Sequence, residues 1–247
     1  MHSVSSAAGR APHAQPLWPL PLLAGTLPAI AAPIAWSISV DQQLIPACNP
    51  FVDGCVSISR AARYGLANYL FRALVLPAAV LQGLTWWLLA VWLLRLEVIA
   101  ARRARTLGVI GAAAAMFLVV YASFLGTDGE VYRWARRYGV VFYFGFTCIG
   151  MLMVADAVRR RSGQSALRIS GVLMALCAAL PALGLINAFA PLYLPRETTR
   201  DVVQNVTEWW AGLVFSVFFW MLARAWAKTH FGARFAVSEL PRTPAGD

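Results

Sequence analysis

The sequence predicts an all-α, polytopic membrane protein: a bundle of six transmembrane helices with both termini in the cytoplasm. Three observations support this prediction. Six apolar segments are each long enough to cross a bilayer, which takes about 20 residues of helix. The chain of 247 residues is 60% hydrophobic and only 13% charged. Its arginines are concentrated in alternate connections between these segments, as the positive-inside rule requires.

The predicted spans follow from apolar length and composition. They are Leu17–Ile38, Leu70–Leu94, Thr106–Gly126, Tyr138–Ala157, Ile169–Leu194 and Trp209–Ala227. They divide the chain into a polar N-terminus (1–16), a transmembrane domain (17–227) and a basic tail (228–247). The first loop, residues 39–69, is the longest predicted outer connection.

The first span allows a second interpretation. Arg10, an apolar run and the small residues of Ala29-Ile30-Ala31 also fit a cleavable secretory signal. Several prolines would kink a retained helix: Pro19, Pro21, Pro28 and Pro33. Cleavage would leave five spans with the C-terminus still inside, so the other assignments hold in either case.

Positive charge predicts the orientation. Thirteen Lys and Arg residues and four acidic residues lie in the N-terminus, the second and fourth loops, and the tail with the adjoining span end. Eight Arg residues and seven acidic residues lie in loops 1, 3 and 5 with their span ends. Positively charged short loops stay in the cytoplasm, so loops 1, 3 and 5 are exocytoplasmic. The net charge of +10 therefore indicates topology and anionic lipid, and we expect no nucleic-acid partner. The Ala- and Arg-rich composition favours a bacterial inner membrane.

The four cysteines fall into two pairs. Cys148 and Cys177 lie in apolar spans, where a thiol behaves as a small hydrophobic group. Cys48 and Cys55 lie in the first loop with Pro50 between them, in an oxidising compartment, which favours a disulfide. A metal site is disfavoured because the histidines, at positions 2, 13 and 230, are far from this loop. No metal or haem spacing occurs, so we expect no cofactor.

Polar residues mark the outer ends of three spans. Ser57 or Ser59 can cap a short helix before Asn68 and Arg72. Arg72 either snorkels to lipid phosphate or pairs with a carboxylate, for which Glu208 and then Asp128 are the candidates.

The third and fifth loops add further candidates. In the third loop, Asp128 and Glu130 alternate with arginines and aromatics up to Arg136, Arg137 and Tyr138. An interfacial belt explains the aromatics well and the two acids less well. In the fifth loop, Asn205-Val206-Thr207 is a glycosylation sequon, which carries little weight in a chain of bacterial composition. Glu208 and Trp209 follow at the start of the last span.

The spans contain few polar residues: Gln82, Thr85, Ser123, Thr147, Ser170, Asn187 and Ser216. We expect them to form hydrogen bonds between helices or to their own backbone. No Asp, Glu, Lys or His lies in mid-bilayer, which disfavours proton-driven transport.

Two short motifs resemble the DRAM/Frag/Sfk family, which includes autophagy modulators and GPI-anchor lipid-remodelling factors. They are Ser57-Ile58-Ser59 at the end of the first outer loop and Glu208-Trp209 at the start of the last span, with Arg72 a weaker match. The resemblance covers about residues 17–226 and implies six spans and lipid handling. Many members have a histidine near the start of the fourth span, where this chain has Arg136, Arg137 and Tyr138. This chain therefore lacks the residue for any family chemistry that relies on that histidine.

The leading hypothesis is a protein that binds or remodels a lipid at the outer end of the bundle. The expected lipid-binding residues are Ser57, Ser59, Asn68, Arg72, Arg136, Arg137, Tyr138, Asn205, Glu208 and Trp209. Catalysis stays open: Glu208 or Asp128 could act as base, and Ser59 or Ser57 as nucleophile, but no Gly-x-Ser-x-Gly motif is present. The alternatives are a non-catalytic subunit or scaffold of a membrane complex, bound to a membrane-protein partner, and a small-molecule transporter or channel. A cavity open sideways to lipid would favour the leading hypothesis.

Overall fold

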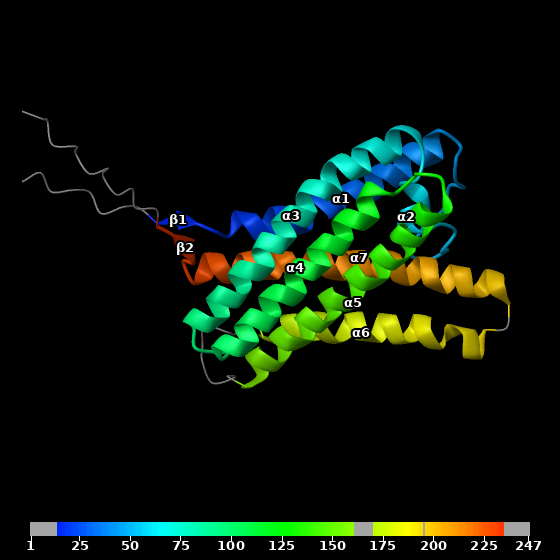
Figure 1. Ribbon diagram of the computed structural model, residues 1–247. Helices are drawn as coiled ribbons and strands as arrows, with labels where there is room; N and C mark the ends of the chain where they lie inside the picture. Colours follow the sequence, from blue (N-terminus) through cyan, green and yellow to red (C-terminus); the bar gives the residue numbers. More distant parts are fainter. Residues whose placement is uncertain (1–13, 161–169, 195, 235–247) are drawn as a thin grey trace, which may run out of the picture.

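The computed structural model describes residues 14–160, 170–194 and 196–234. Within them the chain is almost entirely helical (Figure 1). The helices are α1 (Pro19–Asp41), α2 (Ile58–Ala61), α3 (Gly65–Arg95), α4 (Ala101–Ser123), α5 (Glu130–Arg160), α6 (Ser170–Tyr193) and α7 (Glu197–Lys228). Two strands of two residues, β1 (Gln15–Pro16) and β2 (Gly232–Ala233), flank them. Arg10, Arg161, Arg168 and most of the predicted N-terminus and basic tail lie outside the described residues.

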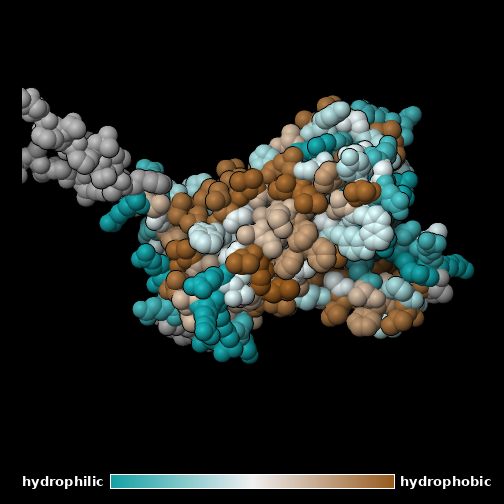
Figure 2. Space-filling view, in the orientation of Figure 1, coloured by the Kyte–Doolittle hydropathy of each residue, from teal (hydrophilic) through white to brown (hydrophobic). Residues whose placement is uncertain are grey.

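Six of these helices are long and apolar enough to cross a membrane, which confirms the predicted fold class. The face drawn in Figure 2 is mostly apolar along the middle of the bundle and more hydrophilic toward both ends. Two helices are longer than predicted: α5 begins at Glu130 instead of Tyr138, and α7 at Glu197 instead of Trp209. Hydropathy detects only the apolar part of a helix. With 32 residues, α7 is about 48 Å long, against a hydrocarbon core of about 30 Å.

Helix order sets the architecture. α3 packs against α1 and α4, α4 packs against α5, and α7 packs against α1 and α6. Figure 1 shows that α1 and α3 diverge from α7 toward one end of the bundle, where α2 and the first loop lie. We call this the α2 end. The wedge between the diverging helices holds the site described below.

Both described ends of the chain lie at the opposite end of the bundle. β1 and β2 pair antiparallel, with Gln15 opposite Ala233 and Pro16 opposite Gly232. An even number of spans returns the chain to the side from which it started, and this pairing agrees with six. It places the two described ends of the chain on one side of the bundle; that this side is cytoplasmic stays a prediction.

Small residues allow close helix contact, as is common in membrane bundles. At Gly25 of α1, an added Cβ would lie 2.7 Å from the Ser216 carbonyl oxygen of α7. Trp86 of α3 is 1% exposed and stacks on Phe218 of α7, with ring centroids 5.5 Å apart. These contacts fix the crossing of α1, α3 and α7 at the narrow end of the wedge.

Candidate functional site

A buried polar cluster lies at the α2 end, formed by Ser59 of α2, Tyr121 of α4 and Glu208 of α7; we call it the Ser59–Glu208 cluster. The Glu208 Oε1 atom accepts hydrogen bonds from the Ser59 backbone N–H at 3.1 Å and from the Ser59 hydroxyl at 3.2 Å. The hydroxyl groups of Ser59 and Tyr121 are 2.8 Å apart. Three segments distant in sequence therefore meet at one carboxylate.

The cluster has one consistent proton arrangement when Glu208 is ionised. An ionised carboxylate only accepts hydrogen bonds, and a serine hydroxyl has a single proton. Ser59 gives that proton to Glu208, so the Tyr121 hydroxyl must donate to the Ser59 oxygen. The result is a directed chain from Tyr121 through Ser59 to Glu208.

Hydrogen bonds to the backbone hold α2 in this position. Ser57 is the N-cap of α2, as predicted, and its hydroxyl accepts from the Arg60 N–H at 3.1 Å. The Ser39 hydroxyl donates to the Ala61 carbonyl oxygen at 2.6 Å. The Asn68 side chain donates to the carbonyl oxygens of Ala62 and Leu125, each at 3.0 Å. Asn68 thereby links α3 to the loop that follows α2 and to the loop that follows α4.

The first turns of α7 hold the first loop in the same way. Asn205 donates to the Gly54 carbonyl oxygen at 2.8 Å, and the Trp209 indole donates to that of Val56 at 2.9 Å. These bonds occupy the polar groups of two predicted lipid-binding residues. The observed contacts of Asn205 and Trp209 hold the first loop against α7.

Two arginines lie near the cluster. Arg63 and Arg136 are close enough to Tyr121 to act on it electrostatically. The Arg136 Nη1 atom donates to the Thr127 carbonyl oxygen at 2.5 Å, which fixes its position. The Arg63 Nε atom is buried and finds no hydrogen-bond partner among the described residues. An unpaired buried donor is costly.

An apolar cavity of about 130 Å³ lies in the wedge below the cluster. Its walls come from α1, α3, α4, α5 and α7, with Ile58 of α2 and Phe51 of the first loop beside them. Tyr121 and Glu208 are among the lining residues, as are Gln82 and Tyr143 deeper in the bundle. Pro33 and Leu213, also in the lining, are exposed on α1 and α7.

A second hydrogen-bonded group lies at the deeper part of the cavity. The Gln82 amide donates to the Ala24 carbonyl oxygen at 3.2 Å and accepts from the Tyr143 hydroxyl at 3.1 Å. Both side chains are buried. The cavity is therefore apolar along most of its wall, with polar groups at Glu208 and Gln82.

The structure brings together some of the predicted site residues and not others. Ser59 and Glu208 meet, and Ser57, Asn68, Asn205 and Trp209 support the same loop. The prediction of an Arg72–Glu208 ion pair is wrong: neither residue forms an ion pair within the described part of the chain. The Arg72–Asp128 alternative is absent there too. The Glu208 Oε1 atom accepts from Ser59 instead, which packing of α2 against α7 brings to it.

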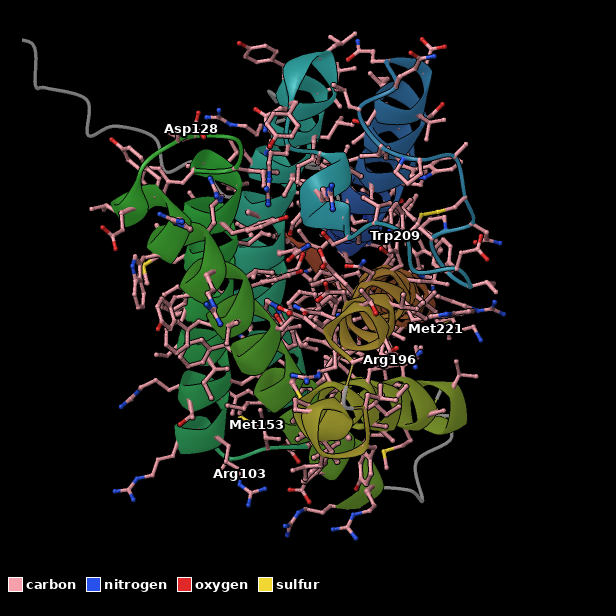
Figure 3. All side chains as sticks on the ribbon, turned by 90° about the vertical axis from the view of Figure 1, so that its right-hand side faces the viewer. Arg103, Asp128, Met153, Arg196, Trp209 and Met221 are labelled. Carbon is pink, nitrogen blue, oxygen red and sulfur yellow. A yellow bond between two sulfur atoms is a disulfide. The ribbon has the colours of Figure 1, made fainter. Side chains whose placement is uncertain are left out.

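The remaining predicted residues lie at the surface. Asp128 is exposed, and Figure 3 shows it far from Trp209. Arg137 and Tyr138 are exposed on the first turns of α5. No group of three or more His, Cys, Asp or Glu residues suited to a metal occurs in the described ranges.

Tyr121 and Arg63 are the site residues that the sequence did not reveal. Tyr121 lies near the end of an apolar span, where an interfacial tyrosine is expected, and Arg63 is one of several arginines near a headgroup region. Only the packing of α2 between α4 and α7 distinguishes Tyr121 and Arg63 from other tyrosines and arginines near the ends of spans. Comparison of the chain with protein-family models, curated proteins and solved structures finds no match.

Proposed function

We propose that this protein binds a membrane lipid, with an acyl-chain segment in the wedge cavity and the headgroup at the Ser59–Glu208 cluster. The observation that carries the proposal is the coincidence of an apolar cavity with a buried polar cluster at the α2 end. Apolar walls with a few fixed polar groups are typical of ligand sites.

The size of the cavity limits what it holds. Apolar cavities of about 150 Å³ bind a molecule such as benzene. A cavity of about 130 Å³ therefore accommodates a short stretch of hydrocarbon and not a whole lipid. The rest of the chain would leave past the exposed Pro33 and Leu213, between α1 and α7, into the bilayer. The mostly apolar lining also favours a lipid over a hydrated path for a polar solute.

The headgroup would meet charges of both signs. The buried Nε donor of Arg63 has no partner among the described residues. It would suit a phosphate oxygen, because guanidinium groups bind phosphate as planar forks. Glu208 would accept a hydrogen bond from a hydroxyl or amine of the same headgroup. The exposed Arg137 lies outside this pocket and would contact lipid phosphate at the rim.

Filling the cavity tests the proposal without altering the cluster. Ala32 lines the cavity and is 8% exposed, so Ala32→Phe would occupy the space of the hydrocarbon. Ala73→Phe, on an exposed face of α3, is the matched control. Native mass spectrometry of the purified proteins should show a retained lipid in the wild type and control, and its loss in Ala32→Phe.

The alternatives predict different results. Equal lipid retention in all three proteins would refute the cavity as the binding site. If no protein retains lipid, the scaffold hypothesis is favoured instead. Ala29→Phe provides a second filling variant in the same wall if Ala32→Phe does not fold.

One observation favours acyl transfer as a second candidate function. The Ser59 hydroxyl donates to a carboxylate, the arrangement of a nucleophile and its general base. In such a reaction, Ser59 Oγ would form a bond to the ester carbonyl carbon while its proton passes to Glu208. The departing alcohol oxygen would then take that proton, leaving an acyl-serine for a water or lipid hydroxyl to attack. Labelling by a fluorophosphonate probe that is lost in Ser59→Ala would support this; no labelling of the wild type would refute it.

A further inference from the structure

A groove lies at the other end of the bundle, where α3 ends and α4 begins. It has a volume of about 360 Å³ and lies between α3, α4 and α5. Its lining residues are Leu93, Ile99, Arg103, Leu107, Ile149, Leu152, Met153 and Asp156. Figure 3 shows Arg103 and Met153 near each other and away from Trp209. The groove is therefore separate from the wedge cavity.

Three arginines gather on one carboxylate at the polar end of this groove. Asp156 of α5 accepts from Arg103 of α4 at 3.0 Å and from Arg160 at 2.9 Å through the same Oδ2 atom. Its Oδ1 atom lies 3.4 Å from Arg159. The three arginine side chains are 53%, 57% and 70% exposed, for Arg103, Arg160 and Arg159.

The charges of this cluster do not balance. One carboxylate faces three guanidinium groups, each of which has five N–H donors. Most of these donors have no partner among the described residues. Exposed ion pairs of this kind contribute about 0–1 kcal/mol to stability, which is a weak reason to collect three arginines. A phosphate group would supply the missing negative charge and acceptor oxygens.

The apolar part of the groove continues from these arginines toward the membrane. Ile149 and Leu152 are each 46% exposed, although they belong to an apolar helix. Leu107 and Met153 complete the wall beside them. A hydrocarbon chain placed along this wall would have its polar end next to Arg103 and Arg160.

We infer that this groove binds an anionic phospholipid, with the phosphate on Arg103 and Arg160 and one acyl chain over Ile149 and Leu152. The excess positive charge favours an anionic headgroup over a zwitterionic one. Basic pockets between transmembrane helices are known sites for such lipids. The inference does not depend on the lipid proposed for the wedge cavity.

Lipid titration of the purified full chain in detergent tests the inference. The probes are phosphatidylglycerol and phosphatidylcholine with identical acyl chains, and the readout is the rise of the melting temperature with lipid concentration. Phosphatidylglycerol should stabilise the wild type at lower concentration than phosphatidylcholine. The double variant Arg103→Gln with Arg160→Gln should weaken this effect about tenfold or more.

The matched control removes the same charge from neighbouring positions. Arg102→Gln with Arg105→Gln changes two exposed arginines of α4 that are not in the groove lining. This control should keep the wild-type response. Equal responses to the two lipids, or equal losses in both double variants, would overturn the inference.

A third variant tests the apolar wall of the groove separately from its arginines. Ile149→Trp narrows the apolar wall and leaves the arginines in place, so it should weaken the response to phosphatidylglycerol as well. If the arginine variant does not fold, the Ile149→Trp variant alone tests the inference. An unchanged response of Ile149→Trp to phosphatidylglycerol would overturn it. Ala73→Phe, on an exposed face of α3 and in neither lining, should leave the response unchanged.

Discussion

The indole Nε1 of Trp209 donates to the carbonyl oxygen of Val56 at 2.9 Å and so joins the last helix to the first loop across 153 residues of sequence. Trp209 is only 3% exposed. Phe51 packs against it, with ring centroids 5.3 Å apart. The loop that carries Ser59 toward Glu208 is therefore held at a position fixed by α7.

Removing this hydrogen bond should destabilise the α2 end. Trp209→Phe keeps an aromatic ring but leaves the Val56 carbonyl oxygen buried without its partner, at a cost of about 1–3 kcal/mol. The melting temperature in detergent should fall. Trp87→Phe is the control, because Trp87 is 59% exposed. Equal melting of the two variants would contradict the role assigned to Trp209.

Cys48 and Cys55 lie at disulfide distance, with Cα atoms 6.6 Å apart, as the sequence predicts. We expect the bond to form in cells, because the predicted orientation puts this loop in an oxidising compartment. Closing a loop of this length stabilises the fold by about 2.5 kcal/mol in the chain-entropy description. Cys48→Ser and Cys55→Ser should therefore lower the melting temperature equally, and the double variant no further. Two free thiols in protein from intact cells would refute the prediction.

Hydropathy and residue type predict most of this fold. Each predicted span overlaps one long helix, because burial in a bilayer demands an apolar run that is visible in the sequence. The N-cap at Ser57 and the cysteine pair are equally local, since each depends on residues only a few positions apart.

The site was only half predictable. Ser59 and Glu208 were candidates, but Arg72 was a better partner for Glu208 by charge alone. The packing of α2 against α7 decides otherwise, because it brings the Ser59 N–H and hydroxyl to the carboxylate. Contacts between helices depend on crossing angles set by small residues such as Gly25, which hydropathy does not report.

Enlarging Gly25 should separate α1 from α7. A Cβ atom at this position would lie 2.7 Å from the Ser216 carbonyl oxygen and 3.0 Å from the Phe219 Cβ atom. Overpacking of this kind costs about 1–3 kcal/mol, so Gly25→Val should lower the melting temperature. The same change at Gly145, where nothing lies within 4 Å of an added Cβ, is the control. Equal stability of both variants would show that the helices do not meet at Gly25.

The paired ends of the chain predict the result of a labelling experiment. β1 and β2 place Gln15 opposite Ala233. The distribution of positive charge predicts that this side is cytoplasmic. With the native cysteines replaced, Gln15→Cys and Ala233→Cys should react with a membrane-impermeant maleimide only after permeabilisation. Val52→Cys, in the first loop and 70% exposed, should react in intact cells. The opposite pattern would invert the orientation, and a split between Gln15 and Ala233 would contradict the fold.

The Ser59–Glu208 hydrogen bonds predict strong coupling between these two residues. Glu208→Ala leaves the Ser59 N–H and hydroxyl without their acceptor, and Ser59→Ala removes only the hydroxyl. Residues in one network have interaction energies of about 0.5–3 kcal/mol. The stability lost in the two single variants, added together, should therefore exceed the stability lost in the double variant. Melting in detergent measures all three. Arg72→Ala with Glu208→Ala is the matched cycle, and its losses should add because Ser59 and not Arg72 contacts the carboxylate. Additive losses for Ser59 with Glu208, or coupling between Arg72 and Glu208, would show that the carboxylate has a different partner in the membrane.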